Sequence, residues 1–167
     1  MIYGIGTDIL AIKRVEALYK KYGTALPERI LTTVEKEDIK LAADPVRFLA
    51  KRFAAKEAFS KAVGTGLRAP VSLQQIGIGH NSLGKPEFFC EAPLREWLAE
   101  QGIGRVHLSL SDEADYIAAF ALAEAARKTN PPPFRLPMPL VGSLKAQSSL
   151  KTRFTTHKPA RYHVPTF

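Results

Sequence analysis

Apolar and polar positions recur along the first part of the chain in patterns that predict short, closely packed elements. Residues 2–8 form an apolar run typical of a strand, and residues 11–22 carry apolar side chains at helical spacing. Thr32 and Glu35 stand at the spacing of a capping box, and this predicts a second helix over about residues 33–41.

The longest predicted helix begins at Asp44-Pro45. Aspartate is a favoured N-cap, and proline is tolerated at the first helical position because that position has no intrahelical hydrogen bond to lose. Apolar side chains then recur along one arc of the helix as far as Val63. The segment Gly64-Thr65-Gly66 follows directly and ends the helix.

The segments after this helix have mostly strand character. Residues 73–79 and 86–90 flank a polar turn and predict a hairpin, and a short helix over 93–101 precedes two more strands at 105–110 and 116–123. Because the helices are grouped between one N-terminal strand and the later hairpins, this order favours an α+β fold over regular βαβ alternation. We expect an antiparallel sheet packed on the long helix.

Composition changes abruptly after Lys128. Residues 129–167 hold seven of the chain's twelve prolines and six Lys or Arg with no Asp or Glu, so they carry six units of the formal net charge of +8. Proline at this density removes backbone donors and does not sustain a helix or a central strand. We therefore predict a folded domain over residues 1–128 and a Pro-rich, basic, disordered tail over residues 129–167.

The basic excess alone does not indicate nucleic acid, because most of it lies in the tail. The tail has few aromatic side chains among its basic residues, no amphipathic periodicity and no recognised RNA motif, so we expect neither a nucleic-acid nor a membrane partner. The competing function class is a binding module, in which the basic tail binds nucleic acid or an anionic membrane and the globular part has no catalytic activity. One cysteine, Cys90, and the lack of a secretory pattern at the N-terminus predict a cytoplasmic location.

Candidate chemistry lies on the long helix, where Glu57 and Lys61 share one face. From spacing alone, the simplest interpretation is an ordinary helical ion pair, with the aliphatic stems of Arg52 and Lys56 covering the core. The functional alternative is that Glu57 meets Asp8 at the predicted end of the first strand. Two carboxylates that leave positions for water and phosphate oxygens suit Mg²⁺, which is rarely caged by protein alone.

A series of short segments matches one known family in order and spacing. These segments are Gly6-Thr7-Asp8-Ile9, Arg14, Phe53-Ala54-Ala55-Lys56-Glu57-Ala58-Phe59-Ser60-Lys61-Ala62, Gly64-Thr65-Gly66, Gly84-Lys85-Pro86 and Ser109-Leu110-Ser111. On these segments, the chain resembles the small bacterial holo-acyl-carrier-protein synthases of the 4′-phosphopantetheinyl transferase superfamily over roughly residues 1–125.

The resemblance implies the fold of that superfamily and an enzyme that transfers the 4′-phosphopantetheine group from coenzyme A to a serine of apo-acyl carrier protein, releasing adenosine 3′,5′-bisphosphate. It also implies Mg²⁺ and a homotrimer with active sites at subunit interfaces. Carried over by position, Asp8 and Glu57 bind the metal, and Lys61 contacts the coenzyme A diphosphate and stabilises charge as the bridging oxygen leaves. The serine hydroxyl must also lose a proton, and the sequence does not decide whether a metal-bound water or one of the two carboxylates accepts it. The coenzyme A contacts assigned with Lys61 are Arg52, Gly64 and Gly66.

The first predicted helix is a candidate surface for binding the acceptor protein. Acyl carrier proteins are strongly acidic, so we assign Arg14, which matches the family by position, and Lys21 to partner binding. For the lysine, an ordinary solvated surface is the competing interpretation. A carrier domain of a polyketide or fatty-acid megasynthase is an alternative acceptor, and the single-domain size favours a free carrier protein. Asp112 stands where many relatives have His, so no nucleotide contact is assigned to it.

Overall fold

The computed structural model describes residues 1–126 of the 167-residue chain. The predicted tail, residues 129–167, and its predicted disorder lie outside the described residues. The elements in chain order are β1 (Ile2–Ala11), α1 (Ile12–Tyr22), α2 (Ala25–Ile30), α3 (Thr33–Asp38), the 3-10 turn η1 (Ile39–Leu41), α4 (Pro45–Ala62), β2 (Ile76–His80), β3 (Pro86–Cys90), α5 (Ala92–Glu100), β4 (Ile103–Asp112) and β5 (Tyr116–Ala125).

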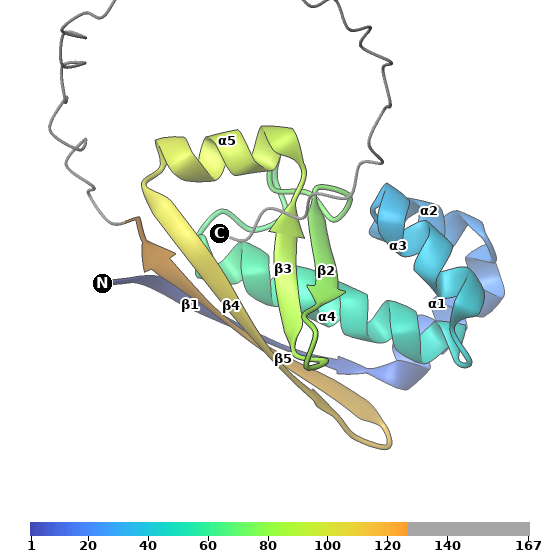
Figure 1. The fold of residues 1–167 in the computed structure, drawn as a ribbon. Coiled ribbons are helices and arrows are strands. Elements are labelled where there is room, and N and C mark those ends of the chain that lie inside the picture. Colours follow the sequence, from blue (N-terminus) through green and yellow to red (C-terminus); the bar gives the residue numbers. More distant parts are fainter. Residues whose placement is uncertain (127–167) are drawn as a thin grey trace, which may run out of the picture. The chain divides into compact units, whose positions relative to one another are not determined.

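An antiparallel sheet in the order β1-β5-β4 packs on the long helix α4, as Figure 1 shows. Alternate residues of β5 are buried on the helix side, and Phe59 of α4 lies in the same core. This arrangement confirms the predicted α+β fold. The N-cap of α4 is confirmed as well, because the Asp44 side chain accepts a hydrogen bond from the backbone N–H of Arg47 at 2.9 Å.

The β1 backbone lies directly on the α4 backbone. A Cβ atom built on Gly6 would stand 2.1 Å from the carbonyl oxygen of Ala58 and 2.5 Å from the backbone nitrogen of Ala62. A Cβ on Gly4 would stand 2.2 Å from the carbonyl oxygen of Ala62. Residues two apart in a strand share a face, so the same approach directs Asp8 toward the helix.

The predicted hairpin is confirmed as β2 and β3, which pair in register from Ile76 with Cys90 to His80 with Pro86. These strands form a separate two-stranded sheet. Ile78 of β2 packs with Ala55 of α4 and Leu108 of β4, so the hairpin completes a small core shared with the helix and the main sheet.

Three local expectations differ from the structure. β1 continues to Ala11, so Asp8 lies inside the strand and pairs with Ala119 instead of ending it, because the ladder with β5 extends past the apolar run. The short helix α2 was not predicted; Pro27 in its first turn is compatible with a helix start. The second predicted helix is divided into α3 and η1, although its capping box between Thr32 and Glu35 is confirmed.

None of the helices within residues 1–126 is both long and apolar enough to span a membrane.

Candidate active site

Three side chains from β1 and α4 meet where the strand crosses the helix. We call Asp8, Glu57 and Lys61 the carboxylate cluster. The Lys61 ammonium lies 2.9 Å from Oδ1 of Asp8 and also donates to the carbonyl oxygen of Thr7 at 2.8 Å. Glu57 stands one helical turn before Lys61 on the same face of α4. The sequence-based pairing of the strand aspartate with the helix glutamate and lysine is therefore present in the fold.

The two carboxylates of the cluster influence each other. Burial raises the pKa of Glu57, the negative charge of Asp8 raises it further, and the Lys61 ammonium acts in the opposite direction. The net result is a Glu57 pKa above the usual range of a glutamate. A half-buried carboxylate that is held near a second carboxylate gains from an added cation, because the cation offsets both the desolvation and the repulsion.

The donor set of this cluster fits Mg²⁺ on chemical grounds. Within residues 1–126, no group of three or more His, Cys, Asp or Glu side chains could hold a metal ion, so a cation here takes two carboxylates at most from the described part of the chain. That is too few for a structural zinc site. Mg²⁺ accepts one or two carboxylates and completes its shell with water and substrate phosphate oxygens.

The turn after α4 is shaped by glycines. Gly64 and Gly66 have φ angles of 81° and 64°, a backbone conformation that favours glycine. The Gly64 N–H donates to the Lys61 carbonyl at 3.1 Å, and the Gly66 N–H donates to the Ser60 carbonyl at 3.2 Å. Both groups therefore close the end of the helix that carries Lys61. The contact of these glycines with coenzyme A stays a prediction.

The structure does not bring Arg52 to the carboxylate cluster. Its Nε lies 3.2 Å from Oε1 of Glu35, its side chain is 7% exposed, and its guanidinium stacks 4.4 Å from the ring centroid of Phe48. Lys56 pairs with Oε2 of the same glutamate at 2.5 Å. The Arg52 guanidinium is therefore already paired with Glu35. Its contact with coenzyme A stays a prediction.

Sequence reasoning missed Glu35 as a buried counter-charge, since the residue was read only as part of a capping box. The available signal was the pair of cations, Arg52 and Lys56, on an apolar helical arc. A buried cation requires a partner of opposite charge, and Glu35 precedes them in a segment predicted to be a helix.

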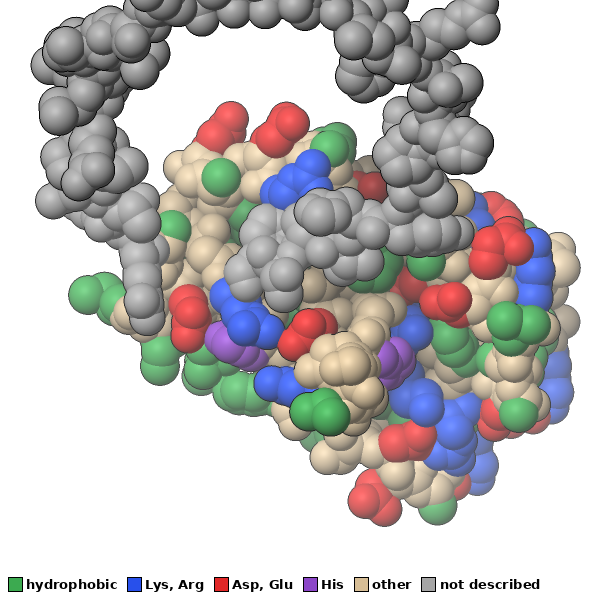
Figure 2. All heavy atoms as spheres, viewed as in Figure 1, with side chains coloured by type: hydrophobic (Ala, Val, Ile, Leu, Met, Phe, Trp, Pro, Cys, Tyr) green, Lys and Arg blue, Asp and Glu red, His purple; other side chains and the backbone are tan. Residues whose placement is uncertain are grey.

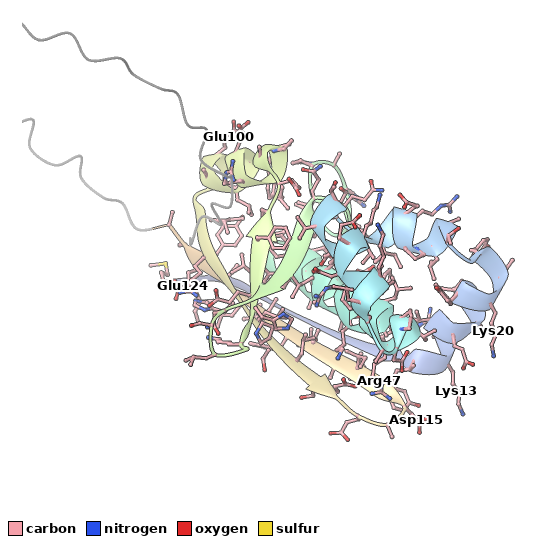
Figure 3. The ribbon with its side chains drawn as sticks, turned by 45° about the vertical axis from the view of Figure 1, so that its right-hand side comes forward. Lys13, Lys20, Arg47, Glu100, Asp115 and Glu124 are labelled. Carbon is pink, nitrogen blue, oxygen red and sulfur yellow. The ribbon has the colours of Figure 1, made fainter. Side chains whose placement is uncertain are left out.

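The residues predicted to bind the partner are exposed on α1. Figure 3 shows Lys13 and Lys20 projecting outward from this helix, and Figure 2 shows Lys and Arg side chains gathered at the same end of the molecule, near the start of α4. Arg14 and Lys21 are exposed as well, and Lys21 lies 5.1 Å from the ring centroid of Tyr22. The fold thus leaves this basic helix surface open.

Asp112 is held by two cations of α4. Its Oδ1 accepts from Arg47 and its Oδ2 accepts from Lys51 at 3.1 Å, while Arg47 also donates to the carbonyl oxygens of Glu113 and Ala114. Partial burial raises the pKa of Asp112, but the hydrogen bonds from Lys51 and Arg47 outweigh it and leave the pKa below its usual range. These contacts fasten the β4–β5 turn to the start of α4, a role that the sequence did not reveal.

Comparison with known proteins connects this geometry to one family. The model of the 4′-phosphopantetheinyl transferase superfamily matches residues 4–121. A holo-[acyl-carrier-protein] synthase of Neisseria meningitidis is 62% identical over 124 residues, which cover 74% of this chain and 99% of that relative.

Solved structures agree with the sequence comparison. The crystal structure of holo-[acyl-carrier-protein] synthase from Neisseria meningitidis matches with a TM-score of 0.73 and 60% identity, covering 74% of this chain and 99% of that one. A holo-(acyl-carrier-protein) synthase from Bacillus anthracis, solved in complex with CoA (3′,5′-ADP), matches with a TM-score of 0.63 and 36% identity over 75% of this chain and 99% of that one.

Proposed function

We propose a function from one premise: this chain belongs to the 4′-phosphopantetheinyl transferase superfamily and is similar to its holo-[acyl-carrier-protein] synthases. Its activity is the transfer of 4′-phosphopantetheine from coenzyme A to apo-acyl carrier protein. We assign this reaction to the carboxylate cluster. The observation that supports the assignment is the contact of Lys61 with Asp8 beside a Glu57 whose pKa is raised.

Lys61 is the residue placed to act on the diphosphate of coenzyme A. In the transfer, the serine oxygen bonds to the phosphorus of the pantetheine arm, and the bond from that phosphorus to the bridging oxygen breaks. Negative charge develops on the leaving adenosine 3′,5′-bisphosphate. A lysine ammonium aimed at that oxygen stabilises this charge. The Lys61 side chain is 49% exposed, so it can exchange its contact with Asp8 for a phosphate oxygen.

Asp8 and Glu57 are the residues that would hold Mg²⁺. When bound there, the ion supplies positive charge that neutralises the diphosphate and lets both carboxylates remain ionised. The Asp8 side chain is 17% exposed and sits on a strand that is paired with β5 and packs backbone to backbone on α4, which holds its carboxylate in place. Rigid placement of this kind contributes to catalysis by positioning.

The serine hydroxyl must lose a proton in the reaction. We propose that a water held at the metal or one of the two carboxylates of the cluster accepts this proton.

The assignment predicts a mass shift on the acceptor. Incubation of apo-acyl carrier protein with this chain, coenzyme A and Mg²⁺ adds the mass of one phosphopantetheine group to the carrier, as measured by intact mass spectrometry. Removal of Mg²⁺ with EDTA abolishes the shift, and added Mg²⁺ restores it, because the diphosphate charge is otherwise not neutralised. An unshifted carrier in the presence of Mg²⁺ and folded enzyme would refute the function. Full transfer in EDTA would refute the metal requirement alone.

We further propose a homotrimer assembled through the outer face of the main sheet. Ile5 and Ile9 of β1 point away from α4 with exposures of 60% and 72%, and Phe120 of β5 is 41% exposed on the same face. Contiguous apolar side chains of this kind mark protein interfaces more often than free surface. Figure 1 shows that α4 covers only the opposite face of this sheet.

A charge placed on that face should separate the subunits. We expect Ile5→Glu to convert the trimer into monomers in light scattering, because burying the carboxylate in an apolar interface is costly. Leu83→Glu serves as the matched control, since Leu83 is 91% exposed in the β2–β3 turn, which is not part of the main sheet. A monomeric wild type, or a trimeric Ile5→Glu variant, would contradict the proposed interface.

The acidic acyl carrier protein is proposed to dock on α1 through Arg14 and Lys21, whose exposed charges would raise the encounter rate and select the partner. The cytoplasmic location stays a prediction from the sequence.

A further inference from the structure

Glu35 is a fully buried carboxylate that binds several elements together. Its exposed fraction is 0%, and Oε2 accepts from the Thr32 backbone N–H at 3.0 Å, while Oε1 accepts from the Ile78 backbone N–H of β2 at 3.0 Å. The side chains of Lys56 and Arg52 reach the same carboxylate from α4. We call Glu35, Arg52 and Lys56 the buried ion cluster.

Lys56 extends these connections beyond the carboxylate. Its ammonium donates to the carbonyl oxygen of Ile30 at 2.7 Å and to that of Leu73 at 2.8 Å, in addition to Glu35. These acceptors belong to the end of α2 and to the segment before β2. Burial lowers the pKa of Lys56 to about 8, against the opposing effect of Glu35, so the ammonium is still the main form at neutral pH. The middle of α4 is thus hydrogen-bonded to elements on the side away from β1.

The carboxylate cluster lies on α4 between two fixed contacts. With about 100° of rotation per residue, Glu57 is about 100° and Lys61 about 140° around the helix from Lys56, while Ala58 and Ala62 are at about 200° and 240°. Ala58 and Ala62 face the glycines of β1, and Lys56 faces Glu35. The backbone contact with β1 sets how closely the strand and helix approach. The buried ion cluster links another side of the helix to α2, α3 and β2.

We propose that Glu35, Lys56 and Arg52 are positioning residues that fix the rotation of α4, and with it the placement of Glu57 and Lys61 opposite Asp8. This inference rests on the proposed function of the carboxylate cluster. None of the residues of the buried ion cluster touches the substrate in this account. They act through the helix that carries the functional side chains.

A small rotation of α4 about its axis would move Glu57 and Lys61 by a distance that matters for catalysis. Side chains extend about 5 Å from a helix axis, so a roll of about 20° displaces a carboxylate by about 2 Å. A misplacement of about 1 Å can cost about 100-fold in rate where catalysis depends on positioning. Gly4 and Gly6 have no side chain that could interlock with the α4 backbone at Ala58 and Ala62 and oppose such a roll. Directional hydrogen bonds to a buried carboxylate do resist it.

Stability alone does not account for a buried ion cluster. Charged groups lose hydration when buried, and their replacement by apolar side chains of similar volume is often neutral or stabilising. Such groups contribute to conformational specificity in several proteins. In this chain, the conformation specified is the rotation of the helix that carries Glu57.

The first test removes the ammonium and leaves one cation for the buried carboxylate. Lys56→Met keeps a side chain of similar length and leaves Glu35 paired with Arg52. We expect the variant to fold with kcat reduced at least about tenfold, and with the KM for apo-carrier protein within about threefold of the wild type, since α1 is untouched. Its crystal structure should show the contact between Lys61 Nζ and Asp8 Oδ1, 2.9 Å in the wild type, broken or lengthened.

A second variant guards against loss of folding. Glu35→Gln combined with Arg52→Met and Lys56→Met removes every charge of the cluster and keeps one amide oxygen, which can accept from one of the two backbone donors, Thr32 or Ile78. We expect it to fold and to lose kcat as Lys56→Met does. Leu98→Ala, a buried position of α5 outside the cluster, is the matched control for stability loss and should keep kcat within about twofold of the wild type.

Several outcomes would overturn the inference. They are near-normal kcat in the folded variants, a kcat loss no greater than that of Leu98→Ala at equal stability, or an unmoved α4 in the variant structure. Unfolding of both cluster variants would also overturn it, because the cluster would then be required for the fold itself. An inactive wild type would instead refute the proposed function, while the variant structures would still decide whether α4 had rotated.

Discussion

We expect Asp8→Asn and Glu57→Gln each to lower kcat by about 100- to 1,000-fold while the chain remains folded. Both substitutions keep the volume of the side chain and remove one negative charge from the carboxylate cluster. Asparagine at position 8 no longer binds a cation strongly and no longer attracts Lys61, which lies 2.9 Å away. Because Lys61 is about half exposed, the lost ion pair itself contributes little to stability. Mass spectrometry of the carrier protein over time gives kcat, and thermal unfolding monitors the fold.

Glu100→Gln provides the matched control for this pair. Glu100 is exposed at the end of α5, and Figure 3 shows it at the end of the molecule opposite Arg47. Neutralising it should leave kcat within about twofold of the wild type, since surface substitutions away from a site have small effects. If Asp8→Asn or Glu57→Gln retained near-normal turnover, the assignment of that carboxylate to the site would be wrong.

Gly6→Ala should damage both stability and activity. The added Cβ would meet the carbonyl oxygen of Ala58 at 2.1 Å and the backbone nitrogen of Ala62 at 2.5 Å, so neither obstacle can move without shifting a whole element. We expect a loss of about 3 kcal/mol in the free energy of unfolding, the upper part of the range for overpacking. Because β1 also carries Asp8, its displacement from α4 should lower kcat about 100-fold at temperatures where the variant is folded.

The control for Gly6→Ala is the same substitution elsewhere in a strand. A Cβ at Gly79 of β2 would have Phe89 atoms at 3.8 and 4.0 Å as its nearest contacts, which are ordinary packing distances. Gly79→Ala should therefore change stability by less than about 1 kcal/mol. Chemical denaturation compares the two variants directly. Equal stability of Gly6→Ala and Gly79→Ala would show that β1 can retreat from α4 at no cost.

The sequence indicated the carboxylate cluster because local signals and the resemblance agreed. Glu57 and Lys61 are placed by helical periodicity alone, and the helix start at Asp44 was readable from its capping pattern. Asp8 was placed near them by its strand and by the resemblance. The close approach of the β1 glycines to Ala58 and Ala62 of α4 brings that strand to the helix and required the fold to be seen.

Other features depend on contacts between residues far apart in the chain, which periodicity does not reveal. The partners of Glu35 are 17 and 21 positions away on α4, and Asp112 is fastened by Arg47 and Lys51 across the β4–β5 turn. Sequence reasoning interpreted Arg52 and Lys56 most simply as residues whose aliphatic stems cover the core. It assigned Arg52 to coenzyme A, whereas the fold places a buried carboxylate beside it.

The central claim is that the carboxylate cluster holds the metal and the diphosphate of coenzyme A. A crystal grown with coenzyme A and Mn²⁺ in place of Mg²⁺ tests it most directly, because Mn²⁺ accepts the same oxygen ligands and is visible by its anomalous scattering. We expect one anomalous peak in contact with carboxylate oxygens of Asp8 and Glu57, with the diphosphate within hydrogen-bond distance of Lys61. Ordered coenzyme A with the Mn²⁺ peak away from both carboxylates would contradict it.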